Sequence, residues 1–113
     1  MIVARARIDD GGLLLSFEAK GHAGFGPRGS DIVCAAFTVL ARTAYSALAG
    51  LPGASVEGRA KSPGDLDFRI ESMPEELRER AIGISVFLVE GLSGLAREFP
   101  LEIGWTVEMQ RRV

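Results

Sequence analysis

The chain has 113 residues, 47% of them apolar, and a net charge of −2. A chain of this length can bury one packed core, so we treat residues 1–113 as a single domain that needs no disulfide and no structural metal. Thirteen basic residues nearly balance fifteen acidic ones. This argues against a general nucleic-acid binder, because such proteins carry a basic excess that neutralises phosphates.

Two segments of alternating polarity open the chain and predict a β-hairpin. Period-two alternation is typical of half-buried strands. The apolar positions are Ile2, Ala4, Ala6 and Ile8 in the first segment, and Leu13, Leu15, Phe17 and Ala19 in the second. Between them, residues 9–12 read Asp-Asp-Gly-Gly, and these residue types tolerate the positive φ angles of a tight hairpin turn.

A glycine-rich stretch and then a helix follow the hairpin. Five glycines and prolines between residues 21 and 29 forbid a regular element over most of that stretch. Asp31 offers a helix N-cap, and Gly50 and Pro52 end the helix. Its apolar stripe consists of Val33, Ala36, Phe37, Leu40, Ala41, Ala44 and Leu48.

The second half of the chain repeats the pattern with two strands, a helix and a last strand. We expect strands near residues 54–60 and 66–71, joined through residues 62–65, and a final strand from 101 to about 108. Pro74, followed by two glutamates, opens the second helix in the way that the helix dipole favours. Its apolar stripe is Leu77, Ala81, Ile84, Leu88, Leu92, Leu95 and Phe99, and Phe68, Phe87 and Trp105 stand at expected core positions.

The element order is therefore ββαββαβ. Each strand has one polar face, so both helices should cover the same side of the sheet. The sequence predicts an α+β fold, a two-layer sandwich with a five-stranded, mainly antiparallel sheet and two helices on one face. The order of the strands within the sheet stays open.

Charge enters at Arg5, and we expect neither a signal peptide nor a membrane span. The single cysteine cannot form an intramolecular disulfide, which fits a reducing compartment. We therefore expect a cytoplasmic protein.

The glycine-rich stretch carries the chain's only histidine, His22, and its only cysteine, Cys34. If Asp31 caps the helix, Cys34 lies in its first turn, where unpaired N–H groups and the helix dipole stabilise a thiolate. An imidazole would then act as the base, and N–H groups at the helix start could hold an oxyanion. The plainer alternative is a cysteine that fills the core and a histidine on the surface.

Other interpretations of the same stretch are weaker. One histidine, one cysteine and Asp31 fall short of the four ligands of a structural zinc site, so we expect no metal and no cofactor. The loop fits neither glycine-rich phosphate-binding pattern. Asp31 either caps the helix or orients His22, Ser30 is an alternative cap, and Arg28 is either a solvated loop charge, which we favour, or a substrate contact.

The runs Gly21-His22-Ala23, Gly29 and Asp31-Ile32-Val33-Cys34-Ala35-Ala36 resemble the signature of the ribosomal-processing cysteine protease family, Prp (YsxB-like proteins). The N-terminal hairpin, the total length and the element order also match, so the resemblance covers essentially the whole chain. The chain departs from many members in Thr38, where they have serine, and in Pro27, which restricts the loop.

The resemblance implies a homodimeric endopeptidase that removes the N-terminal extension of a bacterial large-subunit ribosomal protein. From the charge balance and the N-terminal sequence we expect no direct contact with nucleic acid or membrane. Cys34 would be the nucleophile and His22 the general base. The supporting residues would be Gly21, Gly29, Ser30, Asp31 and Thr38, and the substrate loop Ala23, Gly24, Phe25, Gly26, Pro27 and Arg28, which would order around the peptide.

Two other functions fit the same residues. A non-catalytic module could bind a ribosomal protein or an assembly factor, with Cys34 only packing. A hydrolase of another acyl bond could use the same dyad, because nucleophile and base do not specify the leaving group.

Overall fold

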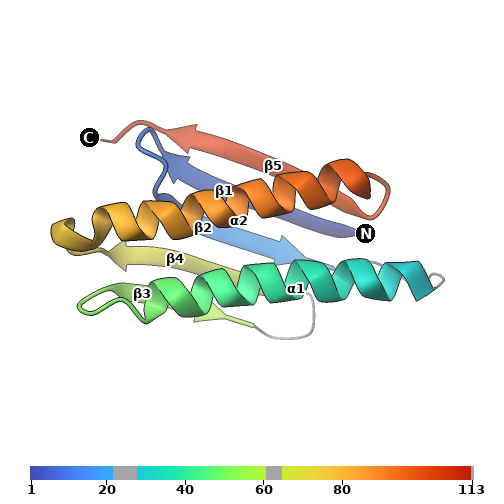
Figure 1. The fold of residues 1–113 in the computed structure, drawn as a ribbon, viewed down its shortest axis with the longest axis horizontal. Helices are drawn as coiled ribbons and strands as arrows, with labels where there is room; N and C mark the ends of the chain where they lie inside the picture. Colours follow the sequence, from blue (N-terminus) through green and yellow to red (C-terminus); the bar gives the residue numbers. More distant parts are fainter. Residues whose placement is uncertain (22–27, 61–64, 113) are drawn as a thin grey trace.

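Residues 1–21, 28–60 and 65–112 are described by a computed structural model, and they form the expected ββαββαβ order (Figure 1). The elements are β1 (Ile2–Asp9), β2 (Leu14–Lys20), α1 (Arg28–Ala49), β3 (Ser55–Arg59), β4 (Leu66–Ser72), a 3-10 turn η1 (Glu75–Leu77), α2 (Arg78–Glu98) and β5 (Ile103–Gln110). The predicted elements are thereby confirmed, with shifted ends described below.

The five strands form one sheet in the order β3-β4-β2-β1-β5. The pairs β1–β2, β2–β4 and β3–β4 are antiparallel, and β1–β5 is parallel. The mainly antiparallel sheet is therefore as predicted. The parallel pair places the first strand between its hairpin partner and the last strand of the chain.

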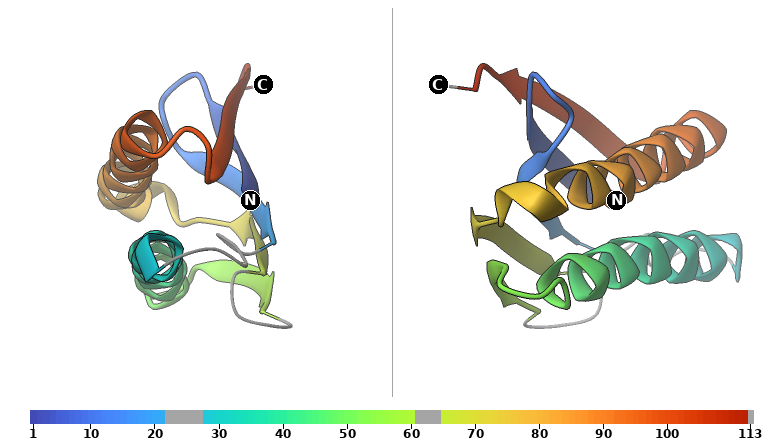
Figure 2. Two further views of the ribbon diagram at one scale, coloured as in Figure 1. Left: turned by 90° about the vertical axis from the view of Figure 1, so that its right-hand side faces the viewer. Right: turned by 60° about the vertical axis from the view of Figure 1, so that its left-hand side comes forward.

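Both helices cover the same face of the sheet, which Figure 2 shows edge-on. The covered face carries Ala4, Phe17 and Phe68, each 1% exposed. The opposite face carries charged residues, and Arg5 forms ion pairs there with Glu18 and Glu108. One apolar and one charged face per strand is the pattern that predicted the two-layer sandwich.

Helix α1 packs on the sheet through Val33, Phe37, Ala41 and Leu48, which are all buried. The ring centroids of Phe37 and Phe17 lie 6.3 Å apart. Among the described residues, α1 holds the one window, Ile32–Ala49, that is long and apolar enough to cross a membrane, with a mean hydropathy of 1.6. The test concerns length and composition only, and the buried residues of α1 face the sheet, so the expectation of no membrane span stays a prediction.

A β-bulge changes which leucines of the hairpin are buried. The pairing shifts between Arg7, opposite Ser16, and Ile8, opposite Leu14. Leu14 is consequently fully buried and Leu15 only half-buried, which corrects the predicted alternation. An extra residue on one strand reverses the facing of the residues beyond it.

Three further details differ from the predictions. The 3-10 turn η1 precedes α2, so α2 begins at Arg78 rather than at Pro74. Strand β5 begins at Ile103, and Leu101 is exposed in the turn before it. Phe87 is not a core residue, because its side chain is 72% exposed on the outer side of α2.

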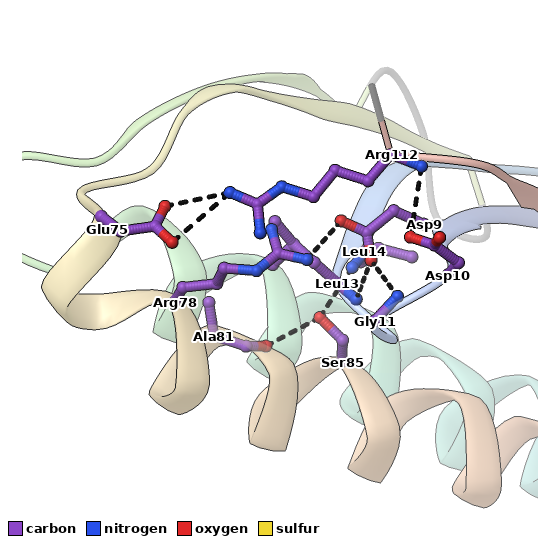
Figure 3. Close-up of polar contacts among 10 residues, drawn as sticks. All are labelled: Asp9, Asp10, Gly11, Leu13, Leu14, Glu75, Arg78, Ala81, Ser85 and Arg112. Atoms are coloured by element: carbon purple, nitrogen blue, oxygen red, sulfur yellow. Dashed lines mark hydrogen bonds and ion pairs between the residues drawn. The ribbon is translucent and has the colours of Figure 1, made fainter.

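The carboxylate of Asp9 joins the hairpin turn to α2 (Figure 3). Its Oδ1 accepts the N–H groups of Gly11 (2.9 Å) and Leu13 (3.0 Å), and its Oδ2 accepts a hydrogen bond from Arg78 (2.6 Å). Burial alone would raise the pKa of Asp9, but the bonds from Arg78 and from the two N–H groups outweigh it and hold the pKa below its ordinary value.

Candidate active site

Cys34 lies on α1 as its seventh residue, half-buried and packed against the core. Helix α1 begins at Arg28, three residues before Asp31. The prediction that Asp31 or Ser30 caps the helix is therefore wrong, since both residues lie inside the first turn. Pro27 precedes this helix start, and proline is favoured at the beginning of helices. That signal was available in the sequence.

The earlier helix start changes how Cys34 can be activated. Cys34 is six positions after Arg28, which places it about 9 Å along the helix axis from the start. The free N–H groups belong to the first four residues, and the dipole acts mainly within the first turn. The predictions that the helix start stabilises the thiolate and holds the oxyanion assumed a start near Asp31, and they do not fit a helix that begins at Arg28. The role of His22 as the base stays a prediction.

Thr38 and Ala41 share the helix flank of Cys34, because they follow it by one and two turns. Thr38 is half-buried. A small cavity on this flank is lined by Phe37, Thr38, Ala41, Arg42, Asp65 and Leu66. The thiol therefore faces the side of α1 that lies beside the start of β4.

His22 and the substrate-loop residues 23–27 fall outside the described residues. Arg28 and Gly29 belong to the first turn of α1 rather than to the loop. The residue that leads into His22, Gly21, has a φ of +97°, and a Cβ there would lie 2.4 Å from the carbonyl oxygen of Met1. Only glycine fits this position, which gives a physical reason for the glycine before the histidine.

The N–H group of Gly21 donates a hydrogen bond to Oδ1 of Asp65 at 3.1 Å. Asp65 comes directly before β4 and is half-buried. Sequence reasoning assigned Asp65 to a connecting turn and missed its contact with the strand end before His22. Its partner is 44 residues away in the sequence, so no local pattern signals the contact.

A larger apolar groove lies between the two helices, with a volume of about 580 Å³. Its lining residues are Val39, Leu40, Thr43, Ala44, Arg80, Gly83, Ile84 and Phe87. Val39 and Thr43 follow Cys34 by five and nine residues, which turns them roughly 140° and 180° around α1 at about 100° per residue. The groove is therefore on the opposite flank of α1 from the thiol.

In the described part of the chain, no three histidine, cysteine, aspartate or glutamate side chains lie together as metal ligands. The site thus consists of a half-buried thiol on the sheet side of a helix and a fixed strand end that leads into the chain's only histidine. These are the parts of a thiol hydrolase that works by nucleophilic attack.

The family described as Cysteine protease Prp matches residues 1–104, and the chain belongs to this family. The predicted family is confirmed, and with it the prediction of a cysteine protease rather than a non-catalytic module. None of the curated proteins compared with this chain matches it.

Solved structures share the fold over almost the whole chain. SMU.848 from Streptococcus mutans is 28% identical, with 97% of this chain and 96% of that one covered and a TM-score of 0.78. The ribosomal processing protease Prp from S. aureus in complex with a covalently linked product peptide is 22% identical, with 96% and 100% covered and a TM-score of 0.76. The same protease with a substrate peptide is 21% identical, with 96% and 100% covered and a TM-score of 0.77.

Proposed function

We propose that this protease removes the N-terminal extension of a bacterial large-subunit ribosomal protein, with Cys34 as nucleophile and His22 as general base. The family match over residues 1–104 carries the proposal, because the matched region contains both residues. The S. aureus protein with the same fold is described as a ribosomal processing protease and holds a substrate or product peptide. A peptide bond is therefore the favoured target among acyl bonds.

The proposed reaction proceeds in two halves. His22 accepts the thiol proton, and the Cys34 sulfur attacks the scissile carbonyl carbon, giving a tetrahedral oxyanion. Collapse of this intermediate breaks the C–N bond, and the imidazolium gives its proton to the leaving amine. Water then loses a proton to His22 and attacks the thioester, which releases the carboxylate of the extension and restores the thiol.

The substrate is proposed to lie on the Thr38 side of α1 and not in the large apolar groove. Cys34 shares its flank with Thr38 and Ala41, whereas the groove residues Val39 and Thr43 are on the far flank. Residues 23–27 connect the strand end before His22 to α1, so a peptide bound across this end of the helix would meet them. We assign these residues to substrate contact and exclusion of water.

A cleavage assay read by mass spectrometry tests the proposal. The wild type, Cys34→Ala, His22→Ala and the control Ser46→Ala are each incubated with a peptide that spans the extension from the same organism. Ser46 is exposed on α1 away from the site. We expect one cut by the wild type and by Ser46→Ala, and none by the other two. Cleavage by Cys34→Ala or His22→Ala would overturn the mechanism.

The failure of the wild type to cut would separate the remaining alternatives. Cleavage of a thioester or small amide by the wild type, lost in Cys34→Ala, would show that the dyad is correct and the ribosomal substrate is wrong. Tight binding of the peptide without any cleavage would show that the protein binds this segment but does not cut it, and would overturn the proposed ribosomal substrate.

We further propose that the protein is a homodimer and that the groove between α1 and α2 forms its interface. Val39 and Phe87 line this groove and are 64% and 72% exposed, and exposed apolar surface that gathers in one place marks interaction sites. A second copy can place its own Phe87 in the groove, which makes the contact self-complementary.

Light scattering after gel filtration tests the interface. We expect a dimer for the wild type, a monomer for Phe87→Ser, and a dimer for the control Met109→Ser, since Met109 is equally exposed but lies on β5. A monomeric wild type, or a dimer that survives Phe87→Ser, would contradict the proposal.

We also propose a cytoplasmic location, where ribosomal proteins are made and where a single thiol stays reduced. Fractionation of cells that express the tagged chain should recover it with cytoplasmic markers. Recovery in the membrane or external fraction would contradict the proposal.

A further inference from the structure

The side chain of Asp65 meets two segments that carry the proposed catalytic residues. Its Oδ1 accepts the N–H group of Gly21, which directly precedes His22. Asp65 also lines a small cavity together with Thr38. Thr38 lies one helical turn after Cys34 on the same flank of α1. Asp65 therefore lies between the strand end that leads into His22 and the helix face that bears the thiol.

The contact with Gly21 continues the sheet beyond its last pair. Strands β2 and β4 pair in antiparallel fashion up to Ala19 opposite Leu66. Past that pair, the side chain of Asp65 accepts the N–H group of Gly21. Lys20 still pairs with Val3 of β1, so the carboxylate fixes one further residue, Gly21, after β2 has ended.

The backbone of Met1 also limits the space around Gly21. The site of its missing Cβ is 2.4 Å from the carbonyl oxygen of Met1, and its φ of +97° is accessible mainly to glycine. The nearby Met1 backbone and the hydrogen bond to Asp65 together restrict the backbone conformation of Gly21. His22 is the next residue in the sequence, so the proposed base is attached directly to this restrained backbone.

We infer that Asp65 is a positioning residue of the protease, whose carboxylate oxygen fixes the backbone of Gly21, the residue directly before the proposed base His22. The inference rests on the proposed roles of Cys34 and His22. In this role Asp65 acts through the hydrogen bond that it accepts from the backbone of Gly21. A displaced base loses much of its effect, because an error of about 1 Å in a reacting group can cost about a hundredfold in rate.

Three variants separate anchoring of the backbone from a role of the charge. Asp65→Ala removes the acceptor, Asp65→Asn keeps an acceptor oxygen and removes the charge, and Asp67→Ala is the matched control. Asp67 stands two residues further along β4 and is exposed. For each variant we would measure kcat and KM on the extension peptide, the Tm, and the rate at which iodoacetamide alkylates Cys34 at neutral pH.

We expect Asp65→Ala to lower kcat by roughly tenfold to a hundredfold, with KM and Tm close to the wild-type values. Its alkylation rate should fall toward that of His22→Ala, because the thiol has lost its base. Asp65→Asn and Asp67→Ala should retain kcat and alkylation within about threefold, a change small against the loss expected from misplacement. If Asp65→Ala does not fold, Asp65→Glu replaces it, since one added methylene moves the acceptor, and the same loss is expected.

Wild-type kcat and alkylation in Asp65→Ala would overturn the inference, and so would an equal loss in Asp65→Asn, because the charge would then matter rather than the anchor. Alkylation needs no substrate, so it separates this inference from the proposed function. Slow alkylation in Asp65→Ala beside a wild type that cuts no ribosomal peptide would uphold the positioning role and reject the substrate. Normal cutting of the peptide by both the wild type and Asp65→Ala would uphold the ribosomal substrate and reject the positioning role.

Discussion

Replacing Asp9 by alanine should destabilise the protein strongly without harming the site. The substitution removes the acceptor of the Gly11 and Leu13 N–H groups and the partner of Arg78. Figure 1 places this turn and the start of α2 at the end of the molecule opposite the start of α1. We therefore expect kcat of the folded variant to equal that of the wild type.

The expected loss in the free energy of unfolding depends on how deeply the Asp9–Arg78 ion pair is buried. The side chains of Arg78 and Asp9 are only 15% and 4% exposed, and breaking a buried pair from one side costs about 3–5 kcal/mol. Water can reach part of the turn, so we expect about 3 kcal/mol for Asp9→Ala. Asp9→Asn keeps the Oδ1 acceptor and should cost about 1–2 kcal/mol, because a charge-assisted bond becomes a neutral one.

Urea unfolding followed by circular dichroism measures these losses, provided that the slope m is unchanged between variants. The control is Glu75→Ala, which removes the exposed ion pair with Arg112 (3.1 Å) and should cost less than about 1 kcal/mol. The reasoning is refuted if Asp9→Ala loses less than about 1 kcal/mol, or no more than the control.

The same carboxylate predicts the direction of the pH dependence. The pKa of Asp9 in the folded protein lies below its ordinary value of 3.8. Its contribution to stability is therefore fully present above the unfolded value and is lost as the pH falls through the folded value. Acid unfolding should be steeper below about pH 4 in the wild type than in Asp9→Asn, and identical slopes would contradict this.

Two further variants test the described contacts. Gly21→Ala places a Cβ 2.4 Å from the oxygen of Met1 at a φ of +97°, and the displaced strand end should lower kcat at least about tenfold. Its control, Gly94→Ala, meets nothing nearer than 3.8 Å and should keep kcat and gain about 0.5–1 kcal/mol. Ser85→Ala removes the acceptor of the Leu14 N–H group (2.9 Å), and urea unfolding should show a loss of about 1–3 kcal/mol with kcat unchanged.

Periodicity predicted the elements and their buried faces because the side-chain pattern depends on local geometry alone. The alternation in residues 2–8 became β1, and the stripe around Phe37 became the buried side of α1. The parallel pairing of β1 with β5 could not be predicted, since alternation fixes the face of a strand and not its neighbour. The bulge that buries Leu14 was hidden for a similar reason, because one extra residue leaves no mark in composition.

In the site too, local sequence predicted some features, and contacts between distant segments decided the others. The motif around Cys34 was sufficient to predict the family, and Gly21 fits its motif position through its φ angle. Asp65 was missed because β2–β4 pairing, not sequence proximity, brings it to Gly21. Phe87 was assigned to the core because it is an aromatic residue beside the apolar stripe of α2. Its side chain is instead exposed.

The position of β1 has a consequence for how the chain is made. Ile2 pairs with Ile103, so during synthesis β1 gains its second neighbour only after all the elements between β1 and β5 have been made. Contacts this distant in sequence form slowly, because the long intervening loop must be closed first. Until then one edge of β1 is open to strands of other chains. Strand β5 therefore covers, within the same chain, an edge of β1 that could otherwise pair with another nascent chain.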